Sequence, residues 1–236
     1  MFKQLLASTL AASSIYSPMT AQASSYPVES VVDAKIRTLN YHLNGVEAKY
    51  GVLLPQVIFA QARTSSYGGC VSNDNRNAVS TRATTAYCGK TNTITLVTEQ
   101  LKSINSRFGD GAVAYTVAHE YAHWMQLIAV KLSNNNGNTP NVPKGIVSQE
   151  LQADCIAGWF MRHTSADMGY DKADWKEAVH FALAAGDSDH GSGKQRAASL
   201  LTGLKSDEIN VCFADQLPGQ IRSTINRIEK WLRLEG

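Results

Sequence analysis

A long apolar segment, residues 112–132, is interrupted by a short polar pattern, and this segment constrains the fold more than any other. Its apolar residues cover nearly the whole circumference of a helix, which is typical of a helix buried on all sides. Asp110, just before it, is expected to act as its N-cap. The polar exceptions are His119, Glu120 and His123. Polar groups at buried positions need hydrogen-bond partners or a metal ion to offset the loss of water.

The exceptions form the pattern His-Glu-x-x-His. Residues four apart on a helix lie on one face, so the His119 and His123 imidazoles can bind one zinc ion. Glu120 lies about 100° around the helix, where it can face a metal-bound water without binding the metal. A zinc metallopeptidase needs two ligands and a general base arranged in this way. The alternative interpretation is a pair of core histidines with structural partners only.

A hydrolytic zinc site usually takes three protein ligands and a water. The next predicted helix begins near Ser148 and carries Glu150 and Asp154 on one face. We expect Glu150 to be the third ligand and Asp154 to accept a hydrogen bond from the free ring N–H of His119 or His123, which would fix that ring's tautomer. Alone, these acids would be a solvated first turn that complements the helix dipole.

Hydrophobic periodicity predicts an α+β protein, rich in helices, with a small β-sheet ahead of the motif helix. Residues 64–90 and 133–143 are rich in Ser, Asn and Gly and are expected to be loops, the first with a possible hairpin. The predicted strands are 56–61 and 93–98, and the predicted helices besides the motif helix are 31–50, 99–108, 148–163, 173–185, 195–204 and 220–234.

The N-terminus has the features of an export signal. A basic start is followed by a mildly apolar stretch and by Ala21-Gln22-Ala23, so we expect removal of residues 1–23 and a single domain over residues 24–236. The apolar stretch is too short to span a membrane, which argues against a stable anchor after cleavage. The net charge of +2, without a basic cluster, gives no indication of nucleic-acid binding. The expected location is periplasmic or secreted.

Four cysteines in an exported chain indicate two disulfides, with three possible connectivities. Cys70 and Cys88 bracket a polar loop, so we favour the pairs Cys70–Cys88 and Cys155–Cys212. Free buried thiols are the alternative, above all for the second pair. Cys155 is not expected to bind zinc, because it lies about 140° around the helix from the Glu150 face.

Four stretches together resemble one family. They are HEYAHWMQ (119–126), ELQADCIAGWF (150–160), HGSGKQR (190–196) and the YCG-x-x-N-x-I-x-L segment (87–96). In content and order they are similar to the bacterial putative neutral zinc metallopeptidase family. The resemblance implies a zincin-like fold of the gluzincin kind, with zinc bound by His119, His123 and Glu150 and with Glu120 as the base.

The chain departs from the family pattern at three places. Members commonly have a Gly-rich N-terminal tail and a membrane anchor, whereas this chain has a cleavable signal pattern. Trp124 stands where a second His often follows the motif, and Asn92 stands where an Asp is usual. These departures concern membrane tethering and local substrate contacts.

The turn-rich loop 186–193 carries His190, which could stabilise the oxyanion of a tetrahedral intermediate. A structural alternative is that His190 and Arg196 fasten the loop. The leading functional hypothesis is an exported zinc endopeptidase acting on a protein or peptide substrate. Two other hypotheses stay open: a zinc-stabilised binding or assembly protein of the cell envelope, and a zinc amidase acting on a non-peptide amide.

Overall fold

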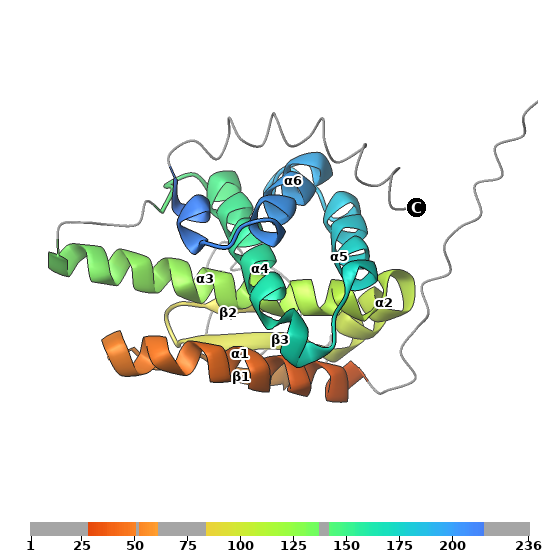
Figure 1. Ribbon diagram of the computed structural model, residues 1–236, viewed down its shortest axis with the longest axis horizontal. Coiled ribbons are helices and arrows are strands. Elements are labelled where there is room, and N and C mark those ends of the chain that lie inside the picture. The colour runs from red at the N-terminus through yellow and green to blue at the C-terminus, as the bar shows by residue number, and fades with distance from the viewer. Residues whose placement is uncertain (1–27, 51, 61–83, 137–141, 215–236) are drawn as a thin grey trace, which may run out of the picture.

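The computed structural model describes residues 28–50, 52–60, 84–136 and 142–214. The mixture of helices with one small sheet in these ranges confirms the predicted α+β class (Figure 1). The predicted helix over 220–234 and residue Cys70 lie outside the described residues. The elements in chain order are α1 (Val28–Tyr50), β1 (Gln56–Ala60), β2 (Ala86–Cys88), β3 (Thr93–Val97), α2 (Thr98–Phe108), α3 (Asp110–Asn136), α4 (Ile146–Met168), α5 (Lys172–Ala184), α6 (Gly193–Leu204) and the 3₁₀ helix η1 (Ile209–Phe213).

The sheet has the order β1-β3-β2. β3 is buried at every position and pairs in parallel with β1, so that Gln56 lies opposite Thr93. On its other side β3 pairs antiparallel with β2, which places Ala86 opposite Thr95. β2 is therefore an edge strand of the described sheet, and α3 packs beside it.

Helix α3 lies between the sheet and the helices α4 and α5, as Figure 1 shows. This position explains why the segment is apolar all round. The prediction that Asp110 is the N-cap is wrong, because the helix already begins at that residue. The carboxylate of Glu177 on α5 instead accepts a hydrogen bond of 3.0 Å from the backbone N–H of Gly111. α3 also continues to Asn136, so its Asn-rich end is helical where the sequence predicted the start of a loop.

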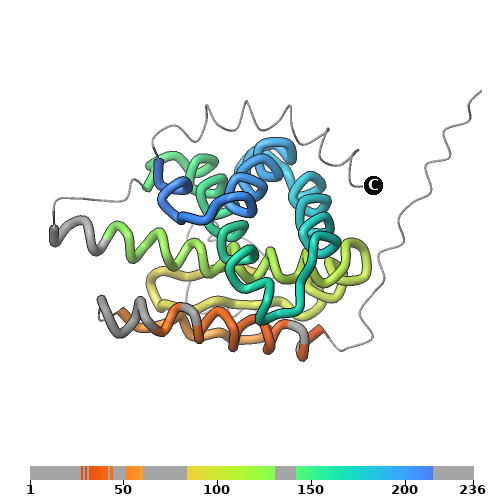
Figure 2. Tube along the Cα trace, in the orientation of Figure 1, coloured from red at the N-terminus to blue at the C-terminus, as the bar shows by residue number. Residues whose placement is uncertain are grey.

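Helices α4 and α6 pack side by side, and Figure 2 shows the course of the chain through both. Two glycines allow this close approach. A Cβ on Gly158 would lie 2.1 Å from the Leu200 carbonyl oxygen, and one on Gly203 would lie 1.9 Å from that of Cys155. Only glycine leaves room for backbone at such distances. α4 is longer than predicted at both ends, beginning at Ile146 and ending before Gly169, which adopts the left-handed conformation common at helix C-termini.

The predicted disulfide between Cys155 and Cys212 is present and joins α4 to η1. Cys88 is also disulfide-bonded. Its predicted partner, Cys70, lies outside the described residues, so that pairing stays a prediction. Among the helices that the structure describes, none has the length and apolar character needed to cross a membrane.

Candidate metal centre

Three side-chain atoms from α3 and from the N-terminal part of α4 converge beside an open cleft. The Nε2 atoms of His119 and His123 are 3.1 Å apart. Oε2 of Glu150 lies 3.1 Å from Nε2 of His119 and 3.5 Å from Nε2 of His123. The spacing of the two histidines along α3 sets the first distance, and the packing of α4 on α3 brings Glu150 to them.

These donors fit zinc. A tetrahedral zinc ion with bonds of about 2.0–2.1 Å would separate its ligand atoms by roughly 3.3–3.4 Å, close to the three distances found. Two imidazoles and one carboxylate are also the set that leaves a fourth position for water in hydrolytic sites. The distances and the ligand types therefore both suit the metal that the motif predicts.

The outer ring nitrogens of the two histidines face oxygen atoms. Nδ1 of His123 lies 2.9 Å from Oε1 of Gln126. Nδ1 of His119 lies 2.8 Å from Oδ1 of Asp154, although its N–H is not aligned well enough to count as a hydrogen bond. Because both oxygens act as acceptors, each Nδ1 carries the ring hydrogen. Two Nε2 lone pairs then face the Glu150 carboxylate, and three converging acceptors need a cation.

Asp154 is fully buried and lies behind His119, on the side away from the converging ligand atoms. It accepts hydrogen bonds from Nε and Nη2 of Arg196, at 3.0 and 2.9 Å, and from the hydroxyl of Tyr115. Nη2 of Arg196 also donates to the Tyr115 oxygen at 2.9 Å. The carboxylate behind His119 is thus neutralised and held by groups from α3 and α6. Nη1 of Arg196 also donates to the Ala185 carbonyl, which fastens the preceding loop.

The charges at the site favour positive charge between the ligands. Burial alone would lower the pKa of His119, but the close contact with the charged Asp154, together with Glu150, raises that pKa to about 10. Burial alone would raise the pKa of Glu150, but its contacts with His119 and His123 hold that pKa below the ordinary range. Carboxylates that favour a proton on His119 also favour a metal cation in the same place.

Glu120 is buried and lines the cleft beside the ligands. Its Oε2 accepts a hydrogen bond of 2.7 Å from the backbone N–H of Tyr87 on β2. This hydrogen bond fixes the orientation of the carboxylate through Oε2 and does not involve Oε1. Glu120 is absent from the converging ligand atoms, in agreement with a position that faces the metal site without joining it.

The cleft has a volume of about 480 Å³ and runs between β2 and α3 to the start of α4. His119, Glu120, His123 and Glu150 lie along it, and Leu127 with Val130 and Val142 gives it an apolar part. A smaller cavity of about 120 Å³ shares His119, Glu120 and His190 with the cleft and is lined by Ile104 and Phe181. The metal ligands are therefore open to a molecule larger than water.

His190 lines both cavities, and its ring is oriented by Asp187. Nδ1 of His190 lies 2.9 Å from both carboxylate oxygens of Asp187, and the backbone N–H of His190 donates to Oδ1 of Asp187 at 2.7 Å. These contacts, led by the backbone hydrogen bond, lower the pKa of Asp187 to about 2. The ring is therefore held through Nδ1, and the Nε2 edge stays available to the cleft.

Several residues of this region were not predicted. Asp187 could have been found from the turn composition of its loop, because Asp side chains often bond backbone N–H groups two or three residues on. Gln126 could have been found as a polar residue within the apolar helix. Tyr115 and Gln152 gave no local signal, since their partners lie far away in the chain.

A family model described as putative neutral zinc metallopeptidase matches residues 56–214. The chain is 28% identical over 124 residues to the uncharacterized protein YpfJ of Escherichia coli strain K12, covering 44% of this chain and 43% of that protein. It is 27% identical over 199 residues to the uncharacterized protein Rv2575 of Mycobacterium tuberculosis strain H37Rv, covering 72% of this chain and 67% of that protein. The match thus spans less than half of the Escherichia coli relative. No solved structure matches the chain.

Proposed function

Because the chain belongs to the putative neutral zinc metallopeptidase family, we propose that it is an exported zinc-dependent endopeptidase. One observation carries this proposal: two imidazoles and a carboxylate converge beside a second, non-ligating carboxylate on an open cleft. A site that only stabilises a fold is usually closed by four protein ligands and has no use for a neighbouring base. The disulfide between Cys155 and Cys212 supports export, because such bonds persist in oxidising compartments.

His119, His123 and Glu150 would hold the metal. When bound, zinc lowers the pKa of a bound water toward about 7 and polarises the carbonyl under attack. Glu120 takes the proton of the attacking water on Oε1, since Oε2 is held by the Tyr87 N–H. The same oxygen then delivers the proton to the leaving amine. Asp154 and Gln126 keep the ring hydrogens on Nδ1, so that both Nε2 atoms face the metal.

His190 is placed to stabilise the negative oxygen that forms during attack. Its Nδ1 is held by Asp187, so Nε2 can donate a hydrogen bond only when the ring is protonated. We assign His190 this role because it lines the cleft, and no Lys or Arg is found among the described residues that line it.

The substrate is proposed to be an extended peptide that lies along β2. The Tyr87 N–H points at Glu120, so alternate residues of this edge strand turn their backbone groups toward the cleft. Thr85, Ala86, Tyr87 and Gly89 line the cleft, so this edge of the sheet forms one of its walls. An extended backbone can pair with such an edge while its side chains enter the apolar part near Leu127 and Val130.

Hydrolysis of casein by the purified protein tests the proposed function. We expect peptide release that stops when a chelator removes zinc and returns when zinc is added back. Mass spectrometry of the products gives the cleaved bonds. Chelation that lowers only the melting temperature, with no hydrolysis under any condition, would contradict the proposal and favour a structural metal site.

A further inference from the structure

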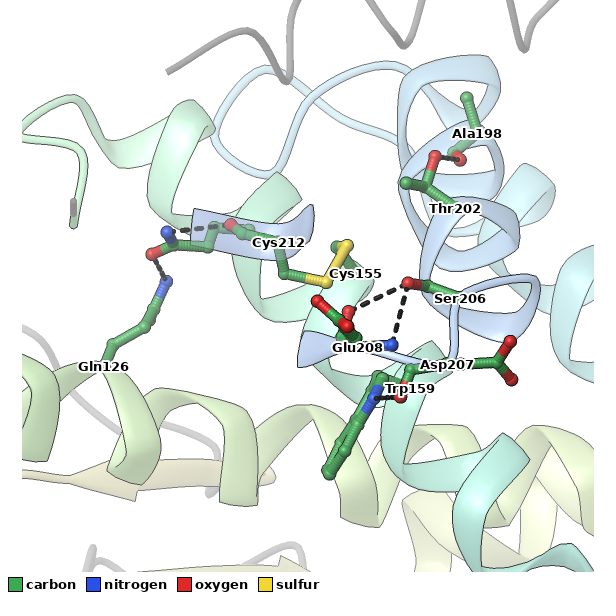
Figure 3. Close-up of a disulfide and its surroundings, with 10 residues drawn as sticks. Gln126, Cys155, Trp159, Ala198, Thr202, Ser206, Asp207, Glu208 and Cys212 are labelled. Atoms are coloured by element: carbon green, nitrogen blue, oxygen red, sulfur yellow. Dashed lines mark hydrogen bonds between the residues drawn. A yellow bond between two sulfur atoms is a disulfide. The ribbon is translucent and has the colours of Figure 1, made fainter. Parts of the chain in front are cut away.

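Two buried glutamines connect the candidate ligand His123 to the disulfide. Oε1 of Gln126 lies 2.9 Å from Nδ1 of His123, and its Nε2 donates to Oε1 of Gln152 at 2.9 Å. Nε2 of Gln152 donates to the Cys212 carbonyl at 3.0 Å. Figure 3 shows Gln126 and Cys212 at the two ends of this pair of hydrogen bonds, with the Cys155 sulfur beside them.

The carbonyl at the end of this chain fixes the direction of every link. A carbonyl oxygen only accepts, so the amide group of Gln152 must present its nitrogen to Cys212 and its oxygen to Gln126. Gln126 must then present its nitrogen to Gln152. The backbone carbonyl of Gln149 accepts from the same nitrogen at 2.8 Å and requires the same orientation.

The oxygen of Gln126 is consequently the atom that faces His123. An amide oxygen can only accept, so Nδ1 of His123 must carry the ring hydrogen and Nε2 must present its lone pair to the metal site. The binding tautomer of His123 is thus specified by carbonyl groups on α4 and η1.

The burial of these amides indicates that their hydrogen bonds matter. Gln126 is 6% exposed and Gln152 is 1% exposed. Burying an amide group without hydrogen-bond partners is unfavourable, so the orientation of each glutamine depends on these partners. The Cys212 carbonyl is itself held because η1 is tied to α4 by the disulfide to Cys155, one turn along from Gln152.

We propose that Gln126 and Gln152 are positioning residues that hold His123 in its metal-binding tautomer, and that the Cys155–Cys212 disulfide supports metal binding through them. The inference rests on the proposed metal site, since it concerns how tightly that site binds. It makes metal affinity depend on a covalent bond between α4 and η1.

The first test measures zinc affinity of the full-length protein by competition with a chromophoric chelator. Gln126→Met keeps the length of the side chain but removes its acceptor and donors, and we expect affinity to fall roughly 10- to 100-fold, as for partners of other metal-bound histidines. The absorption spectrum of the cobalt-loaded protein should change as well. Ser199→Ala removes a fully buried hydroxyl from α6 that has no hydrogen-bond partner among the described residues, and it should leave affinity unchanged.

The second test is a double-mutant cycle between Gln152→Met and the paired change Cys155→Ser with Cys212→Ser. Loss of the disulfide should weaken zinc binding several-fold when Gln152 is present and should have no further effect when it is Met. The melting temperature of the metal-free protein is measured separately for each variant. Loss of the disulfide should lower it in both backgrounds.

The outcomes separate the inference from the proposed function. A wild-type protein that binds no zinc would overturn the metal site itself. Zinc binding by wild type with the same affinity in Gln126→Met would overturn the positioning role and leave the metal site intact. An equal loss of affinity on removing the disulfide in both backgrounds would show that the disulfide affects the metal site by a route other than Gln152, and would overturn that part of the inference.

Discussion

Replacing Glu120 by Gln is expected to lower kcat by about 10²- to 10⁴-fold, the range for loss of a general acid–base group. The amide has nearly the same shape, and its oxygen can still accept the hydrogen bond from the Tyr87 N–H. It cannot take a proton from the attacking water. Zinc content should be unchanged, because the Glu120 carboxylate is not among the converging ligand atoms.

Turnover and zinc content are measured on the same preparation of Glu120→Gln, so that loss of metal cannot be mistaken for loss of chemistry. Glu99→Gln, on the exposed face of α2, provides the matched control and should retain full turnover. Hydrolysis at the wild-type rate by Glu120→Gln would remove this residue from the proposed mechanism.

Replacing Arg196 by Met is expected to lower the free energy of unfolding by about 3–5 kcal/mol, the usual effect of removing one partner of a buried ion pair. Asp154 would lose two charge-assisted hydrogen bonds and stay fully buried. The Tyr115 hydroxyl would lose a donor as well. Urea denaturation of the metal-free protein measures the change without a contribution from metal binding.

Arg162→Met is the matched control for this stability effect. Arg162 pairs with Asp207 at 2.5 Å, but the Asp207 side chain is 82% exposed. Exposed pairs of this kind contribute about 0–1 kcal/mol. If the two variants were equally stable, the buried group around Asp154 would not have the structural importance that its geometry implies.

The convergence of His119, His123 and Glu150 could be predicted because most of it is local. The two histidines lie one turn apart on the same helix, and the apolar pattern around them identifies that helix. Glu150 required one further step, the approach of the next helix in the chain. Asp154 followed from Glu150, since it lies one turn further along α4.

The partners of these residues could not be predicted, because they depend on tertiary contacts. The Glu177 carboxylate meets the N-terminus of α3 although it lies 66 residues from Gly111. That contact is also why the local capping rule failed at Asp110. The chain from His123 to Cys212 joins three elements through side-chain amides, and glutamine in a sequence indicates neither burial nor partner.

The central claim, that His119, His123 and Glu150 bind one zinc ion, is tested most directly by X-ray absorption at the zinc edge. Wild-type protein with one equivalent of zinc should show two imidazole nitrogens and additional oxygen atoms at about 2.0–2.1 Å, without sulfur. His123→Ala should bind zinc far more weakly and lose one imidazole from the spectrum. A wild-type spectrum dominated by sulfur, or one that His123→Ala leaves unchanged, would contradict the account.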